Sequence, residues 1–451
     1  MNKNESPLRS SVGSPLGLPP VNVLGFAEPL PMVSYSVASG RSERLRDTHT
    51  GAACAGVDRP LGNNTESSSP PPTLNHPETL KRQGFRLDRY RQKTYIRNVI
   101  MHANGFLNNE FTDFEEYNKL PRVVKCVRTR CRSDQNVKLH KELQSGNAFY
   151  SGNHVCGSAW LCPTCSAKIE AKRRSEIQMG IESQLAKGKK SLFCTFTIPH
   201  TSGQSCSEVL ANVTKALTRL RSGKVFDKFK KRVGFDGLIR SLEVTLGANG
   251  WHVHTHECWF VDSDVDENEF ASYVADRWLS SCKKFGLIPR GKIKAFRLHG
   301  FKVGFTRSEY MAKFDSDKYV KKLAAEISLS GVKHGRDGSL HPFQLAELAF
   351  SGGRFDKMAV DLFMDYAKSF KGKSRIFWSR GLKDRCGINE KTDQELSEEI
   401  SERAFEICEF EPHGFSRIVK ENAQAVILNL VENGGRSAVD LWFEKFPENP
   451  I

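Results

Sequence analysis

The chain has 451 residues, which is enough for two or three domains that bury their own apolar cores. Its 67 Lys and Arg against 52 Asp and Glu give a net charge of +15, which favours a polyanionic partner, with nucleic acid ahead of an anionic membrane. No apolar run reaches transmembrane length, and residues 1–7 lack the apolar core of a secretory signal. We therefore expect a cytoplasmic protein without a membrane partner. Twelve cysteines in so long a chain do not fit a small disulfide-stabilised scaffold.

The first part of the chain changes character near residue 80. Residues 1–80 are rich in Pro, Ser, Gly and Asn and lack apolar periodicity, which predicts a disordered segment. Residues 81–93 are strongly basic and include Phe85 and Tyr90, a combination that suits phosphate contacts and base stacking. A solvated helix face explains the same composition equally well. This segment opens a basic region that we place at residues 81–185.

The basic region contains cysteines with the spacing of metal ligands. Two of them form a C-x-x-C pair, which lets two thiolates reach one tetrahedral ion. Cys126 and His154 are available as alternatives for the remaining positions. A redox role is the weaker interpretation, because no thioredoxin-like pattern surrounds the pair. We predict a zinc-ribbon-like element whose structural Zn²⁺ is held by Cys131, Cys156, Cys162 and Cys165.

The middle of the chain alternates between strand and helix patterns. We predict a strand over residues 192–200, an amphipathic helix over 206–221, a hairpin over 238–260 and a further helix over 267–285. This order predicts an α+β fold, in which helices cover an antiparallel sheet. Residues 308–327 also have a helical pattern.

The hairpin carries the main candidate site. Residues 247–250 (GANG) have the composition of a turn, and pairing Leu246 with Trp251 places Glu243 opposite His254. Histidines occupy alternate positions of the second strand, so their side chains share one face. A solvated histidine-rich strand is the alternative interpretation. We predict a divalent metal site formed by Glu243, His252, His254 and His256.

A tyrosine and a lysine follow the hairpin at helical spacing. Tyr310 and Lys313 share a helix face, but Tyr319 and Lys322 repeat the spacing, so spacing alone does not choose between the pairs. A divalent ion beside such a pair fits phosphodiester chemistry, because both cations offset charge that develops as the phenol attacks phosphorus. The ligand set accepts Mg²⁺ or Mn²⁺.

The C-terminal part, residues 333–451, is predicted to be mostly helical. An amphipathic helix is expected over residues 353–371, and residues 374–382 form a basic segment with aromatic residues. A further helix is expected over residues 417–432, with a break at residues 434–435, where two glycines are adjacent.

These motifs together resemble the HUH endonucleases, and among them the single-tyrosine Rep proteins that initiate rolling-circle replication of plasmids. The resemblance covers roughly residues 120–385. It is carried by the segments 156–165 (CGSAWLCPTC), 195–200 (TFTIPH), 240–245 (RSLEVT), 249–256 (NGWHVHTH), 310–314 (YMAKF), 341–345 (HPFQL) and 378–382 (WSRGL).

The resemblance implies that residues 186–332 form an HUH nuclease domain with an RRM-like palm. It makes His254 and His256 the metal-binding pair and Tyr310 the nucleophile, which decides between the two tyrosines. Lys313 would then orient the phosphate or stabilise the tyrosinate. In such initiators a carboxylate can activate water to end the cycle, and Glu309 and Glu326 are the candidates.

The implied activity is metal-dependent nicking and rejoining of one DNA strand at a plasmid origin, through a covalent 5′-phosphotyrosine. The enzyme would act as an endonuclease and strand transferase on single-stranded or hairpin origin DNA. A host helicase and a host polymerase are the expected partners. Two alternatives stay open, namely an HUH transposase and a zinc-containing DNA-binding regulator without catalysis.

Overall fold

The fold combines helices with antiparallel sheets, as the sequence predicts. The computed structural model describes residues 77–106, 119–304, 316–328, 339–351, 353–400 and 403–446. Within these ranges the strands form sheets of five, three and two strands, and every pairing is antiparallel. The segment predicted to be disordered lies outside the described residues, except for residues 77–80, which belong to the first helix.

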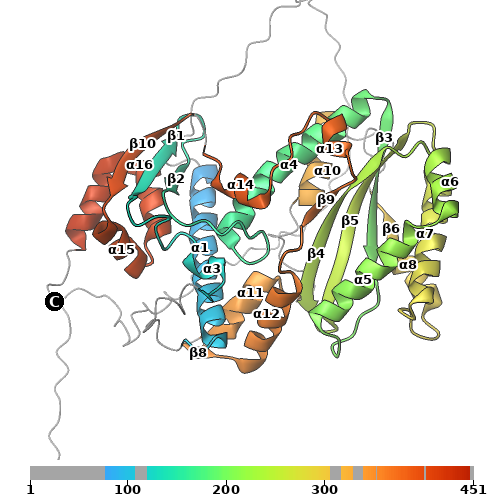
Figure 1. The fold of residues 1–451 in the computed structure, drawn as a ribbon, viewed down its shortest axis with the longest axis horizontal. Coiled ribbons are helices and arrows are strands. Elements are labelled where there is room, and N and C mark those ends of the chain that lie inside the picture. Colours follow the sequence, from blue (N-terminus) through green and yellow to red (C-terminus); the bar gives the residue numbers. More distant parts are fainter. Residues whose placement is uncertain are drawn as a thin grey trace, which may run out of the picture. The chain divides into compact units, whose positions relative to one another are not determined.

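The five-stranded sheet contains the predicted hairpin (Figure 1). Leu246 lies opposite Trp251 and Glu243 opposite His254, so the predicted register is confirmed. Gly250 has a φ of +86°, and a Cβ there would lie 2.7 Å from the carbonyl oxygen of Thr201, which restricts this turn position to glycine. The strands follow the order β6 (Phe301–Val303), β3 (Lys189–Thr197), β5 (Gly250–Asp262), β4 (Gly237–Gly247) and β9 (Ile376–Trp378).

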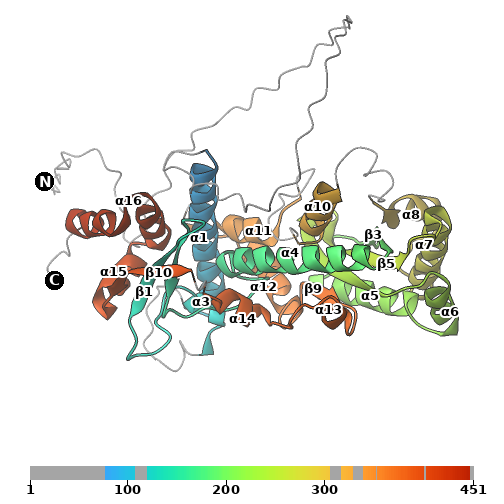
Figure 2. The same ribbon diagram turned by 90° about the horizontal axis from the view of Figure 1, so that it is seen from above.

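Helices pack on both faces of this sheet (Figure 2). Helices α5 (Cys206–Leu220) and α7 (Glu267–Lys284) cover the face that holds the alternating apolar residues of β5, such as Trp259. Helices α4 (Pro163–Ala186) and α10 (Ser316–Ser328) pack on the opposite face, around Cys258 and Phe260. Because side chains alternate along β5, the histidines share this second face.

A three-stranded sheet joins distant parts of the chain. It pairs β1 (Val137–Glu142) with β2 (Ala148–Ser151) on one side and with β10 (Ala404–Phe410) on the other. The C-terminal part does contain the expected helices, but β10 was not predicted. Only Cys408 and Phe410 of this strand are buried, so its sequence gives a weak strand signal.

Helix α1 (Pro77–Ala103) contains the basic segment, and two of its arginines pair with one buried carboxylate. Arg82 and Arg86 both form ion pairs with Glu432 of α16 (Gln424–Lys445), and Glu432 also accepts a hydrogen bond from the backbone N–H of Ala148 at 2.9 Å. The side chain of Glu432 is only 2% exposed. These two arginines therefore link α1 to α16. Their charges are used in ion pairs within the protein, so they fit neither the predicted phosphate contacts nor a solvated helix face.

Replacing Glu432 with glutamine should lower the free energy of unfolding by about 3 kcal/mol, because Arg86 then keeps a buried charge without a counter-charge. Urea denaturation measures this loss. The matched control is Glu406→Gln, whose carboxylate pairs with Lys138 at the surface at 2.9 Å and should contribute little, because solvent screens this pair. Equal losses in the two variants would contradict a special role for Glu432.

The predicted helix over residues 417–432 is in fact two helices. Helix α15 (Pro412–Lys420) ends before Asn422, which adopts a left-handed φ of 52°. Asparagine tolerates this conformation better than most residues, and its side-chain oxygen accepts a hydrogen bond from Arg128 at 2.9 Å. The predicted break near the paired glycines is present, because Gly435 interrupts α16 with a φ of 62°.

The predicted helices over residues 206–221, 267–285 and 353–371 match α5, α7 and α12 (Lys357–Ser369), while α10 covers the described part of the pattern at residues 308–327. No described helix combines the length and the apolar character needed to cross a lipid bilayer. The remaining elements are α3 (Arg122–Lys125), α6 (Lys224–Arg232), α8 (Ile293–His299), α11 (Pro342–Ala349), β7 (Phe350–Ser351), β8 (Arg354–Phe355), α13 (Leu382–Arg385) and α14 (Asp393–Glu398).

Candidate functional site

Three ligand atoms converge on the histidine face of the five-stranded sheet. Glu243 Oε2 lies 3.1 Å from His254 Nε2 and 3.5 Å from His256 Nε2. The three residues offer ligand atoms that all lie within 4.8 Å of one another. Two imidazoles and a carboxylate in this arrangement can hold a divalent ion. The structure thus brings together three of the four residues that the sequence analysis proposed.

The surroundings of Glu243 fit a bound cation. Its second carboxylate oxygen, Oε1, is buried and has no hydrogen-bond partner among the described residues. Such an oxygen is costly unless a donor or a cation reaches it. The side chains of Glu243, His254 and His256 are 10%, 13% and 15% exposed, so the group still contacts solvent.

Local electrostatics keep the carboxylate ionised. Burial alone would raise the pKa of Glu243, but hydrogen bonds with His254 and His256 hold this pKa well below its usual range. A metal ligand must be deprotonated, so the carboxylate is already in the form that binds a cation.

His252 lies outside this group, which corrects the predicted ligand set. Its ring stacks on His254, with 4.6 Å between centroids, and on His200, with 5.0 Å. Burial, followed by the charges of His254 and His200, lowers the pKa of His252 to about 3. A carboxylate opposite the middle histidine also reaches a diagonal neighbour, and here Glu243 reaches His256 instead of His252.

A threonine on the neighbouring strand orients His256. Thr195 of β3 lies opposite His256, and its Oγ1 is 2.9 Å from Nδ1 of that histidine. This hydrogen bond leaves Nε2 directed at Glu243. The segment 195–200 carries part of the family resemblance, but no role was predicted for Thr195. The alternation of Thr195 and Thr197 along a strand was the available signal, since both side chains share one face.

We expect Thr195→Val to weaken divalent-ion binding by about tenfold to a hundredfold, because the imidazole of His256 loses its orienting partner. Titration with Mn²⁺, followed by electron paramagnetic resonance, measures this affinity. The matched control is Thr197→Val on the same strand, since Thr197 Oγ1 donates to the carbonyl oxygen of His299 at 2.9 Å. If the control weakens binding as much, Thr195 has no special role.

Lys302 also faces the site and was not predicted. It lies on β6 opposite Thr195, which places it on the histidine face, and its side chain is exposed. Strand β6 has only three residues and no recognisable alternation, so no sequence pattern marks this lysine.

Tyr310 and Lys313 lie outside the described residues, as does Glu309. The elements before and after them are described. Strand β6 pairs with β3, and α10 packs through its apolar residues on the histidine face. The chain therefore contacts the same sheet on both sides of residues 305–315.

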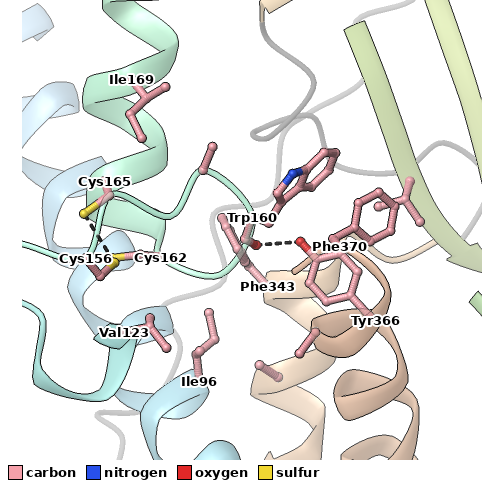
Figure 3. Packing of buried hydrophobic residues seen from close by; sticks show 14 of the residues in the cluster. Ile96, Val123, Cys156, Trp160, Cys162, Cys165, Ile169, Phe343, Tyr366 and Phe370 are labelled. Carbon is pink, nitrogen blue, oxygen red and sulfur yellow. Dashed lines mark hydrogen bonds between the residues drawn. The ribbon is translucent and has the colours of Figure 1, made fainter. Parts of the chain in front are cut away.

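Four buried cysteines form a second candidate metal centre, shown in part in Figure 3. The Sγ atoms of Cys126 and Cys156 each lie 3.6 Å from that of Cys165, and those of Cys162 and Cys126 are 3.7 Å apart. A tetrahedral zinc with bonds of about 2.3 Å requires sulfur–sulfur distances of about 3.8 Å. The donor set and its spacing therefore fit a structural zinc.

Cys126 occupies the position that the sequence analysis assigned to Cys131. Cys131 is exposed, whereas Cys126 is fully buried at the end of α3. Val127 has a left-handed φ of 54° and redirects the chain directly after Cys126, so the later cysteine reaches the surface. The prediction is corrected at this one ligand, and the other three cysteines belong to the group.

Comparison with known proteins finds a similarity in this part of the chain. The family described as "Replication protein" matches residues 149–285, which include β3, the hairpin and the residues Glu243, His254 and His256. The matched segment is therefore similar to a replication-protein domain. Three of the four clustered cysteines also lie within it.

Two curated proteins are similar to the chain. "Protein rep" of Streptomyces lividans is 24% identical over 307 residues, which is 54% of this chain and 66% of that protein. "Neomycin resistance protein" of Streptomyces cyanogenus is 34% identical over 137 residues, which is 25% of this chain and 31% of that protein. The chain thus spans less than two thirds of the length of each. No solved structure matches the chain.

Proposed function

We propose that the protein initiates plasmid replication by nicking one DNA strand at the origin, as an HUH endonuclease. The observation that carries the proposal is the Glu243, His254 and His256 group inside a segment that is similar to a replication-protein domain. The net charge of +15 and the exposed Lys302 beside the group suit a DNA substrate.

In this proposal Glu243, His254 and His256 hold Mg²⁺ or Mn²⁺. Such an ion polarises the phosphodiester and offsets negative charge in the transition state. Tyr310 attacks phosphorus, which forms a bond from its phenolic oxygen to phosphorus and breaks the bond to the 3′ oxygen. The 5′ phosphate stays on Tyr310 and the 3′ hydroxyl is free for a host polymerase. Lys313 orients the phosphate or stabilises the tyrosinate.

The phosphotyrosine retains the energy of the broken bond, so rejoining needs no ATP. We propose that the DNA at the nick is single-stranded or in a hairpin and that a host helicase opens the duplex. Glu326 and Glu309 remain the candidate carboxylates for ending the cycle. The four cysteines, in the same proposal, hold a structural Zn²⁺, and the protein works in the cytoplasm.

Supercoiled origin DNA tests the proposal directly. With Mg²⁺ or Mn²⁺ the purified protein should convert it to the open circular form, and a chelator should stop the reaction. His256→Ala should reduce the rate by at least about a hundredfold, because it removes a metal ligand. The matched control, His299→Ala, changes an exposed histidine and should nick normally.

Two outcomes would favour the rival functions. A wild-type protein that binds origin DNA but never nicks it, with either ion, would be a zinc-containing regulator. Cleavage only at the terminal ends of a mobile element would indicate a transposase. Neither rival has an observation in the structure that favours it over the initiator.

A further inference from the structure

A cavity of about 320 Å³ opens to solvent beside the four-cysteine group. Most of its lining residues come from α1, α4 and β2 with the segments that flank them, and Val127 and Leu428 of α16 complete the lining. None of these residues belongs to the five-stranded sheet that carries the histidines. Its volume lies at the lower end of the range for small-molecule sites, roughly 300–1,000 Å³. The nicking proposed above makes no use of this cavity.

The charge of the lining is positive. Four basic side chains line the cavity, namely Arg82, Arg86, Arg89 and Lys168, and no Asp or Glu is among its lining residues. Glu432 pairs with the first two, whereas the other two form no ion pair with the carboxylates of the described residues. Burial and the charge of Arg86 lower the pKa of Arg89, which indicates a crowded cation.

A zinc centre would not cancel this charge. Four thiolates around Zn²⁺ carry a net charge of about −2, and Lys93 and Lys168 both lie near enough to interact with the cysteines. Those two lysines would balance the centre. Arg89 interacts with the carboxylates of Glu170 and Asp88 but forms an ion pair with neither of them. An anion bound in the cavity would contact Arg89 directly.

Two side-chain amide oxygens in the lining lack hydrogen-bond partners among the described residues. Asn153 is only 4% exposed, and its Oδ1 has no hydrogen-bond partner among the described residues. Asn147 Oδ1 is buried and equally unpartnered, and both residues line the cavity. Proteins rarely leave buried amide oxygens unpaired, so a ligand that donates a hydrogen bond to either Oδ1 atom would suit this cavity.

Three aromatic residues also line the cavity, among smaller apolar ones. Tyr90, Phe149 and Tyr150 line the cavity, and the ammonium of Lys168 lies 5.9 Å from the centre of the Phe149 ring. Aromatic walls suit a flat ring, while arginine and lysine suit a phosphate. A ligand that offers an anion, a ring and an amino donor satisfies all three features.

We propose that this cavity binds one nucleotide. Its phosphate contacts Arg89 and Lys168, its base lies against the aromatic wall, and an exocyclic amino group donates to the amide oxygen of Asn153. The nucleotide is either one unit of a DNA single strand or a free nucleotide. Only the choice of origin DNA as the strand rests on the proposed nicking function.

The test uses the full chain without divalent ions, so that nicking plays no part. The probes are a single-stranded DNA of mixed sequence with about 12 nucleotides, deoxyadenosine 5′-monophosphate and inorganic phosphate. Fluorescence anisotropy measures binding of the strand, and calorimetry measures binding of the two small probes. Thermal unfolding of each variant shows that its fold is kept.

Two variants change the lining of the cavity in different ways. Arg89→Gln removes the positive charge of a lining residue that forms no ion pair among the described residues, and Ala171→Leu adds bulk to the lining without changing its charge. Each has a control on the same helix, Arg91→Gln and Ala186→Leu, whose residues are exposed and do not line the cavity. Both cavity variants should weaken nucleotide binding by about fivefold or more, while the controls stay within about twofold.

The outcomes separate the two sources. If the cavity variants lose affinity only for the single-stranded DNA probe, the cavity binds single-stranded DNA. In that case the slope of log K against log salt concentration should be shallower by about 0.7 for Arg89→Gln than for the wild type. Loss of deoxyadenosine 5′-monophosphate binding assigns it to a free nucleotide. Binding that is unchanged in both cavity variants, or reduced equally in the controls, overturns the proposal. Nicking by the wild-type protein is scored separately, so either proposal can fail alone.

Discussion

A Tyr310→Phe variant should form no covalent adduct with origin DNA, and its nicking rate should fall by at least about a thousandfold. Phenylalanine keeps the ring but lacks the hydroxyl that attacks phosphorus, so no other part of the proposed site is disturbed. Binding of origin DNA should remain close to that of the wild-type protein, because the positive charge of the chain is unchanged.

The chain offers a matched control for this variant. Tyr319 stands three residues before Lys322, which repeats the spacing of Tyr310 and Lys313. Tyr319→Phe should therefore nick normally if Tyr310 is the nucleophile. The measurement is cleavage of end-labelled origin DNA, followed by mass spectrometry of the tyrosine that carries the nucleotide. An adduct on Tyr319, or normal nicking by Tyr310→Phe, would show that the nucleophile is assigned wrongly.

Replacing Cys162 with serine should prevent binding of the zinc proposed above and destabilise the surrounding structure by several kcal/mol. Cys162 is fully buried and immediately precedes α4, so a lost ligand there leaves three thiols around an unfilled coordination position. Zinc analysis of the purified protein should give one ion per chain for the wild type and much less for the variant.

Cys131→Ser is the control, because this exposed cysteine lies outside the buried group. It should keep its zinc and its resistance to urea. Zinc loss in this variant would restore the ligand set predicted from the sequence. Figure 3 shows what packs next to Cys162. The carbonyl oxygen of Trp160, two residues earlier in the chain, accepts a hydrogen bond from the hydroxyl of Tyr366 at 2.5 Å.

Local sequence signals were sufficient for the hairpin. Its register follows from a turn of glycines and asparagine, and that register alone places Glu243 opposite His254. Both partners are close in the chain, so no distant contact was needed to decide their geometry. The helices that cover the sheet were equally accessible, because their apolar residues recur at helical spacing.

Distant contacts explain what the sequence did not reveal. The choice of Cys126 over Cys131 depends on the conformation of a single residue, Val127, and on the packing of α3. Thr195 acquires its role only because β3 pairs with β5, which is about 60 residues away in the chain. Spacing patterns within one segment carry no information on such pairings.

The pairing of β10 with β1 has a consequence for synthesis on the ribosome. Until residues 404–410 have left the exit tunnel, β1 has an open edge on the side that β10 covers, and Arg86 still lacks Glu432. A nascent chain that stalls before that point exposes the unpaired edge of β1 and leaves the charge of Arg86 without its carboxylate partner. The three-stranded sheet and its buried ion pair are therefore complete only after translation has passed residue 432.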